Sequence, residues 1–120
     1  MQVRGVDFVF YHVSDLDKAV AFYRDTLGLD TISQMDGWAE FDARPLALAI
    51  GTMEPERAGG GGGAVALAVP DVQAAVAELR AKGVTIVQDT MHSPVCDVAA
   101  IADPDGNRLY LHRRHDGTFG

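Results

Sequence analysis

The chain has 120 residues, a length typical of one domain with a single core of ordinary size. Hydrophobic residues make up 48% and charged residues 22%, a composition that argues against a disordered or fibrous protein. The formal net charge of −7 argues against nucleic acid as a partner and would attract a cationic small molecule, or it only keeps the protein soluble.

The first predicted elements are a strand, FVFYHV at residues 8–13, and a helix directly after it. The strand alternates in character, as expected of a strand with two different faces. Asp15 stands where a helix N-cap belongs, and Gly28 is placed to end the helix as a C-terminal cap. Between them apolar residues recur at helical spacing: Leu16, Ala19, Val20 and Tyr23.

Three further strands are predicted in the first half of the chain. One begins after Gly28, and the others are GWAEFDA at residues 37–43 and LALAIG at residues 46–51. The run PERAGGGGGA follows, and its five consecutive glycines indicate a flexible linker. A linker of this length would also allow two chains to exchange halves, and the alternative is a simple surface loop.

The second half repeats the first. The segment VPDVQAAVAEL at residues 69–79 aligns with VSDLDKAVAFY at residues 13–23, offset by 56 residues, and five positions are identical. It has its own strand before it, an N-cap at Asp71 and a stop at Gly83. The strands VCDVAAIA and NRLYLH follow later, the last of them after an Asp-Pro and Asp-Gly turn. Each half is therefore predicted as a βαβββ module.

These tandem modules, with VSDLDKAVAFYRDTLGL after the first strand and DPDGN before the last, resemble the vicinal oxygen chelate superfamily. That group includes glyoxalases, extradiol dioxygenases, fosfomycin-modifying enzymes and bleomycin-resistance proteins, and the resemblance covers essentially the whole chain. It implies an α+β fold in which two modules form a curled mixed-sheet cup with helices outside. The expected single domain spans residues 1–120: module 1 at about 1–57, the linker at about 58–63 and module 2 at about 64–120.

In metal-dependent members of that superfamily, the ligands come from the first and last strand of each module. Carried over by motif, these positions are Phe8, Ala49, Ala64 and Tyr110, although no motif fixes the register of the strand that contains Ala49. A catalytic metal needs about three nitrogen or oxygen donors, and phenylalanine and alanine have none. A tyrosine with a pKa near ~10 is a poor ligand at neutral pH. We expect no metal and no cofactor; an unrelated site of two histidines with Glu40 is the alternative.

Strand alternation assigns side chains to the concave face of the expected cup. Trp38 and Glu40 are candidates as well, but the sequence does not fix which face they occupy. Small side chains beside aromatic ones would leave room for a planar guest, unless Trp38 or a loop fills the space. The other predicted ligand-binding residues are Phe8, Phe10, His12, Ala47, Ala49, Ala64, Ala66, Arg108, Tyr110 and His112.

Two classes of function follow from this face. The first is a metal-independent binding protein, similar to the bleomycin-resistance branch, that sequesters an aromatic or cationic antibiotic or natural product for self-resistance. The alternative is a metal-independent, lyase- or isomerase-like enzyme for a natural-product or keto substrate, with His12, Tyr110 and His112 as acid-base groups. A metal-dependent glyoxalase or dioxygenase ranks last. The resemblance also implies a homodimer.

Other features concern the location of the protein. No apolar run reaches the ~18 residues of a membrane helix, and the N-terminal residues lack the apolar core of a signal peptide. The single cysteine, Cys96, can form no internal disulfide and is expected to be buried. We therefore expect a cytoplasmic protein. His92 is predicted in a surface loop and His115 in a polar tail.

Overall fold

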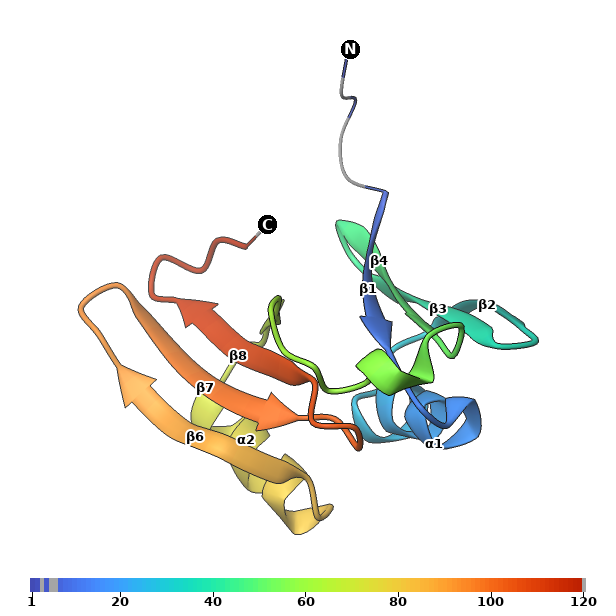
Figure 1. Ribbon diagram of the computed structural model, residues 1–120. Coiled ribbons are helices and arrows are strands. Elements are labelled where there is room, and N and C mark those ends of the chain that lie inside the picture. Colours follow the sequence, from blue (N-terminus) through green and yellow to red (C-terminus); the bar gives the residue numbers. More distant parts are fainter. Residues whose placement is uncertain (3, 5–6, 120) are drawn as a thin grey trace. The chain divides into compact units, whose positions relative to one another are not determined.

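The computed structural model describes residues 1–2, 4 and 7–119. The chain divides into two compact units, Met1–Ala58 and Gly59–Gly120, and each has a four-stranded sheet with a helix packed against it (Figure 1). In the described part of the chain, no helix has the length and apolar character needed to cross a membrane.

The first unit has the sheet order β1-β4-β3-β2, in which β1 pairs with β4 in parallel and the other pairs are antiparallel. Helix α1 packs against β3 and β4. The elements are β1 (Phe8–His12), α1 (Leu16–Val20), a π-helical continuation (Ala21–Thr26), β2 (Thr31–Met35), β3 (Trp38–Ala43), β4 (Leu46–Gly51) and a 3-10 turn (Pro55–Arg57).

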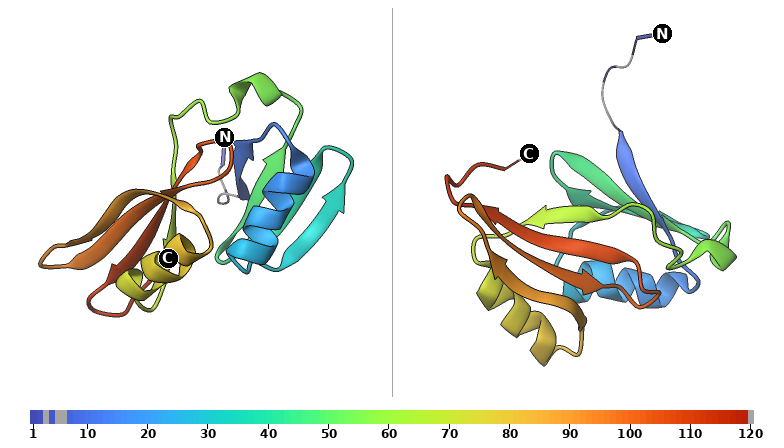
Figure 2. Two further views of the ribbon diagram at one scale, coloured as in Figure 1. Left: turned by 90° about the horizontal axis from the view of Figure 1, so that it is seen from below. Right: turned by 60° about the vertical axis from the view of Figure 1, so that its left-hand side comes forward.

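The second unit repeats this topology with the order β5-β8-β7-β6, and β5 again pairs with the last strand in parallel. Its helix α2 packs against β6, β7 and β8 on one face of the sheet (Figure 2). The elements are β5 (Val65–Ala68), α2 (Val72–Ala81), β6 (Thr85–His92), β7 (Cys96–Ala102) and β8 (Arg108–Arg114). The predicted α+β fold with two βαβββ repeats is confirmed.

Both helices begin as the sequence predicts. The Asp15 carboxylate accepts a hydrogen bond from the Lys18 backbone N–H at 3.1 Å, and Asp71 accepts one from Ala74 at 2.9 Å. After each helix a glycine adopts the left-handed conformation, with φ +79° at Gly28 and +81° at Gly83. The repeated Asp and Gly positions therefore set the two ends of each helical segment.

The first helix differs from the regular α-helix that its periodicity predicts. From Ala21 to Thr26 it widens into a π-helix, and the Leu27 N–H bonds to the Phe22 carbonyl five residues back. Two adjacent aromatic residues, Phe22 and Tyr23, are both buried there, and the Tyr23 ring stacks on Phe41 at 5.8 Å. The equivalent positions of the second repeat are Glu78 and Leu79, and the helix there is a regular α-helix.

Alternation along the strands separates a helix-facing side from an exposed side in each unit. On the helix-facing side Tyr11, Leu48 and Leu111 are buried, whereas Val65 and Leu67 of β5 are half-buried. The core of the first unit includes Tyr11, Val13, Ala19, Val20, Phe22, Tyr23, Ala39, Phe41, Leu48 and Ile50, and that of the second Val72, Val76, Leu79, Ala99, Ile101, Leu109 and Leu111.

The DPDGN turn before β8 is held by a buried polar network. Asp103 accepts hydrogen bonds from the backbone of Asp105 and Asn107 and from the Asn107 side chain, at 2.8 to 3.0 Å. Asn107 Oδ1 in turn accepts a hydrogen bond from the Gly59 N–H at 3.2 Å. The glycine run is therefore anchored at its first residue, in contrast to the uniformly flexible linker that its composition indicates.

Replacing Gly59 with alanine is expected to destabilise the protein by roughly 1 to 3 kcal/mol. Gly59 has φ +70°, and an added Cβ would overlap the Asp105 carbonyl oxygen, so the new methyl group would displace the turn. The free energy of unfolding from denaturant titration measures the effect. Gly63→Ala is the matched control because no atom lies within 4 Å of its Cβ position; equal stability of the two variants would contradict this contact.

Candidate functional site

An aromatic cluster covers the face of the first sheet that points away from α1. The Phe10 ring is stacked on Trp38, with centroids 5.3 Å apart and planes 14° from parallel. Phe8 meets Trp38 edge to face at 5.8 Å, and His12 meets Phe10 in the same way at 4.8 Å. This places Trp38, whose face the sequence leaves open, on the same side as the three predicted residues of β1.

The rings of β1 and β3 meet because the strand between them has small side chains. Strand β4 lies between the two, and its residues on this face are Ala47, Ala49 and Gly51. A Cβ at Gly51 would come within 3.0 Å of the Phe10 ring. In the first unit the Trp38 ring therefore lies on the same face as the small residues of β4.

Carboxylates lie on the same face as the aromatic cluster. Glu40 Oε1 accepts a hydrogen bond from the Trp38 indole N–H at 3.1 Å, which holds the ring in place. Asp42 is paired with Arg44, whose Nε lies 3.3 Å from Asp42 Oδ2. His12 Nε2 lies 3.8 Å from the Glu54 carboxylate. Acidic groups thus border the aromatic surface, and Glu40 is oriented by it.

The second unit has a different exposed face. Tyr110 in β8 stands between Ala66 of β5 and Ala100 of β7, and 40% of its surface is exposed. His112 lies next along the same face, opposite Ala68. Arg108 is on this face too, so the predicted row of Arg108, Tyr110 and His112 shares one side of the sheet.

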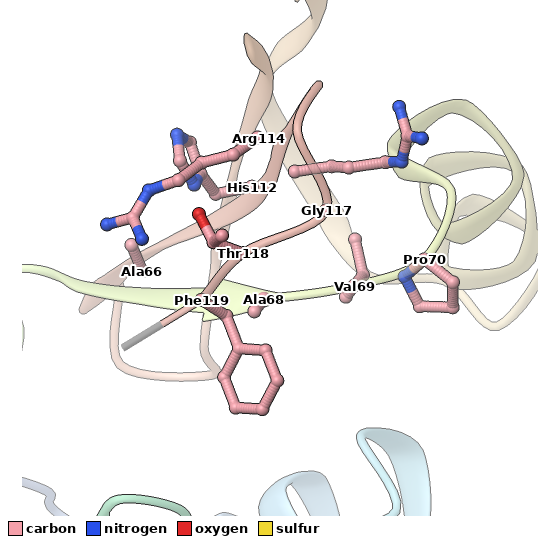
Figure 3. Close-up of a pocket in the computed structure, with 10 residues that line it drawn as sticks. Ala66, Ala68, Val69, Pro70, His112, Arg114, Gly117, Thr118 and Phe119 are labelled. Carbon is pink, nitrogen blue, oxygen red and sulfur yellow. The ribbon is translucent and has the colours of Figure 1, made fainter.

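A hollow with a volume of about 710 Å³ opens beside Ala66 and Ala68 (Figure 3). The hollow lies beside small side chains, and among the described residues of the second unit no two aromatic rings stack on each other there. Sequence reasoning identified Ala66 and His112 but missed the other residues that line the pocket. The sequence feature that could have indicated this lining is the basic pair Arg113 and Arg114, directly after the last predicted strand. The missed residues are Ala68, Val69, Pro70, Arg113, Arg114, Gly117, Thr118 and Phe119.

The metal-ligand positions of the family can be compared directly in the two repeats. In the parallel strand pair of the first unit Ala49 lies opposite Phe10, and in the second Tyr110 lies opposite Ala66, the repeat equivalent of Phe10. Ala49 is therefore the structural counterpart of Tyr110. The set Phe8, Ala49, Ala64 and Tyr110 offers one phenol and no carboxylate or imidazole, so it does not fit a metal. Among the described residues, no three His, Cys, Asp or Glu side chains gather as metal ligands.

Two histidines converge on one carboxylate near the β6–β7 hairpin. His92 Nδ1 lies 2.7 Å and His115 Nε2 3.0 Å from Asp97 Oδ1, and these hydrogen bonds, His115 first, hold the pKa of Asp97 below its ordinary value. His92 is the last residue of β6 rather than a loop residue, because the hairpin turn begins only at Ser93. Cys96, the first residue of β7, is half-buried rather than fully buried.

The sequence matches the model of the Glyoxalase/Bleomycin resistance protein/Dioxygenase superfamily over residues 5–111. Among solved structures it is similar to TnmS3, an antibiotic binding protein from Streptomyces sp. CB03234, with 28% identity, 95% of this chain and 98% of that chain covered, and a TM-score of 0.82.

Two other structures are similar. UcmS2 shares 25% identity, with 93% of this chain and 98% of that chain covered and a TM-score of 0.78. A glyoxalase/bleomycin resistance protein from Streptomyces sp. CB03234 shares 29% identity, with 88% and 98% covered and a TM-score of 0.74. The comparison with curated proteins gave no match.

Proposed function

Because this chain belongs to the glyoxalase/bleomycin resistance protein/dioxygenase superfamily, we propose that it binds an aromatic or cationic natural product without a metal ion and so protects its host cell. Family membership and neighbours such as an antibiotic binding protein at 28% identity support a binding role in general. The chemical class of the ligand and the independence from metal are the steps that we add.

The observation that carries the proposal is the exposed aromatic face of the first unit. Phe8 keeps 44% of its surface exposed, and Phe10 and Trp38 are only half-buried although they stack on each other. Planar aromatic groups that are already fixed in place lose little freedom when a planar ligand stacks on them. Such a surface is therefore suited to an aromatic guest.

The charges around this face favour a positively charged guest over a negatively charged one. The electron-rich faces of tryptophan and phenylalanine attract cations, and Glu40 is fixed beside the Trp38 ring. The only cationic partner in contact with a carboxylate of β3 is Arg44, within the described residues, and it already pairs with Asp42. The net charge of −7 would add to the attraction at long range.

Three acridines of similar shape test the proposal: cationic 9-aminoacridine, neutral acridine at pH 8 and anionic acridine-9-carboxylate. The chain has one tryptophan, so its indole N–H gives one NMR signal that reports on this face alone. We expect 9-aminoacridine to shift that signal, with an affinity about tenfold higher than that of acridine. If none of the three shifts it, the first unit is not the ligand site.

Native mass spectrometry of the protein from its own host identifies the natural ligand. A copurified aromatic or cationic molecule that stays unchanged during incubation supports sequestration. Conversion of that molecule would instead support the enzyme alternative, in which Tyr110 and His112 are the proton-transfer candidates of the second unit because they share one face of β8.

The purified protein is expected to contain no stoichiometric transition metal, and chelators are expected to change neither its stability nor its binding of 9-aminoacridine. The reason is that three of the four positions where metal-dependent relatives carry a ligand are Phe8, Ala49 and Ala64 in this chain. Their side chains have no nitrogen or oxygen atom that could bind a metal. Elemental analysis is the measurement. About one zinc, iron, nickel or manganese ion per chain would contradict this prediction.

We also propose that the protein is a cytoplasmic homodimer. Each sheet taken by itself ends in two edge strands, β1 and β2 in the first unit and β5 and β6 in the second, and exposed edges favour pairing with another chain. Light scattering coupled to size exclusion at micromolar concentration should give the mass of two 12.8 kDa chains. The mass of one chain would refute the dimer.

A further inference from the structure

Two exposed methionines flank Trp38 on the aromatic face of the first unit. Strand β3 lies between β2 and β4 (Figure 1), and Met35 of β2 is the direct antiparallel partner of Trp38, so both side chains lie on one face. On the other side Trp38 is paired with Gly51 of β4, which has no side chain. The end of the Met53 side chain takes that place, since its Sδ lies 3.0 Å and its Cε 2.9 Å from the position of a Cβ at Gly51. A methionine side chain therefore stands on each side of the indole.

These methionines contribute little to the core of the unit. Met35 keeps 62% of its surface exposed, and Met53 keeps 61%. Large apolar side chains that stay in water next to a stacking surface are typical of a binding site, because a ligand that covers them removes apolar area from water. Methionine is also unbranched and has several rotatable bonds, so it can adjust to the outline of a ligand.

The indole and the thioether groups suit different parts of a planar cation. The face of such a ring system stacks on the indole, whereas its edge carries the positive end of the ring quadrupole. Sulfur is polarisable and makes favourable contacts with the edges of aromatic rings. Met35 and Met53 are therefore placed to contact the edges of a guest whose face lies on Trp38.

The fixed carboxylate gives such a guest an orientation. Glu40 is held by the indole N–H and lies on the same face further along β3, opposite Ser33. The direction from Trp38 to Glu40 runs along the strands, and the direction from Met35 to Met53 runs across them. A guest with an amino group at the middle of one long side, such as 9-aminoacridine, can point that group at Glu40 and extend its two ends toward the methionines.

The spacing of the two methionines favours a particular length of guest. Strands β2 and β4 are two strand spacings apart, about 9 to 10 Å. A system of three fused rings is comparable in length to this separation, and a system of two rings is shorter. We propose that Met35 and Met53 determine the specificity of the aromatic face, because they contact both ends of a planar cation of three fused rings but only one end of a shorter one. This inference rests on the proposed function, which assigns a planar cation to this face, and adds the residues that select its size.

Methyl NMR of protein labelled with carbon-13 at the methionine Cε atoms tests these contacts. The chain has four methionines, and Met91 in β6 of the second unit is the matched control because 54% of its surface is exposed. We expect 9-aminoacridine to shift the methyl signals of Met35 and Met53 through its ring current, with the same affinity as the Trp38 indole signal. The Met91 signal should stay in place.

The same titration separates failure of this inference from failure of the proposed function. An unchanged Trp38 indole signal would refute the proposed function and, with it, this inference. A shifted indole signal together with an unshifted methyl signal of Met35 or Met53 would overturn the inference alone.

Substitutions test whether the two side chains select for length. Glutamine is similar in length to methionine but has a polar end, so Met35→Gln and Met53→Gln are each expected to lower the affinity for 9-aminoacridine about threefold, and together about tenfold. The affinity for 4-aminoquinoline, a cation with two fused rings, should fall no more than about threefold in the double variant, because the shorter guest reaches one methionine at a time. Met91→Gln should leave both affinities unchanged.

Two results of this comparison would also overturn the inference. One is an unchanged affinity for 9-aminoacridine in the double variant. The other is an equal loss of affinity for both guests, which would mean that the methionines do not select for length. Thermal unfolding of each variant, with the wild-type midpoint expected because both side chains are exposed, ensures that a lost affinity reflects the missing thioether group and not a loss of fold.

Discussion

Replacing Trp38 with alanine is expected to weaken binding of 9-aminoacridine by roughly 2 to 4 kcal/mol, measured by titration calorimetry. Removal of the indole takes away the ring that stacks on Phe10 and contacts Phe8. It also removes the N–H donor that orients Glu40. The surface would lose both its largest stacking platform and the fixed position of its carboxylate.

A second substitution at the same position separates these two contributions. Trp38→Phe keeps an aromatic ring at this position but has no N–H for Glu40, so it should recover part of the lost affinity. The free energy of unfolding should change little in Trp38→Phe because Trp38 is only half-buried. Wild-type affinity in Trp38→Ala would show that the aromatic face of the first unit is not where this cation binds.

The sequence predicts the topology of both units because the signals for it are local. Asp15 and Asp71 cap helices in the way that their spacing indicates, and Gly28 and Gly83 end them. Alternation within each strand is sufficient to put Phe8, Phe10 and His12 on one face. These assignments need no knowledge of which strands are neighbours, and all of them agree with the structure.

The contents of the two exposed faces depend on contacts between distant segments, and these could not be predicted. Trp38 reaches Phe10 only because Gly51 of the intervening strand has no side chain. In the second unit, the space beside Ala66 stays open, and its walls include Phe119 from the end of the chain. A repeat that looks symmetric in sequence therefore has an aromatic, acid-bordered face in one unit and a basic pocket in the other.

The π-helical segment at Ala21–Thr26 could not be predicted from the sequence either, although it is a local feature. The spacing of apolar residues predicts one continuous helix, but it does not say that Phe22 and Tyr23 both need to enter the core. A π-helical turn at Ala21–Thr26 accompanies the burial of both rings, and nothing in the apolar spacing distinguishes it from a regular α-helix.

The face of the second sheet is tested at Tyr110. Tyr110→Ala is expected to weaken the binding of acridine to the second unit, followed by the backbone N–H signals of Ala66 and Ala68, by ~1 to 3 kcal/mol, because an exposed ring flanked by Ala66 and Ala100 can stack on a ligand. Leu111→Ala is the matched control. Its side chain is buried on the opposite face, so it should cost about 2 to 5 kcal/mol of stability instead.

Tyr110→Phe distinguishes the two ways in which this residue could act. Retained affinity means that the ring contributes by stacking, whereas lost affinity means that the hydroxyl group contributes a hydrogen bond. The position is informative because it is the counterpart of Ala49 in the first unit, where the family's metal-dependent members have a ligand. If Tyr110→Ala binds as tightly as the wild type while Leu111→Ala is destabilised, the exposed face of β8 is not part of a binding site.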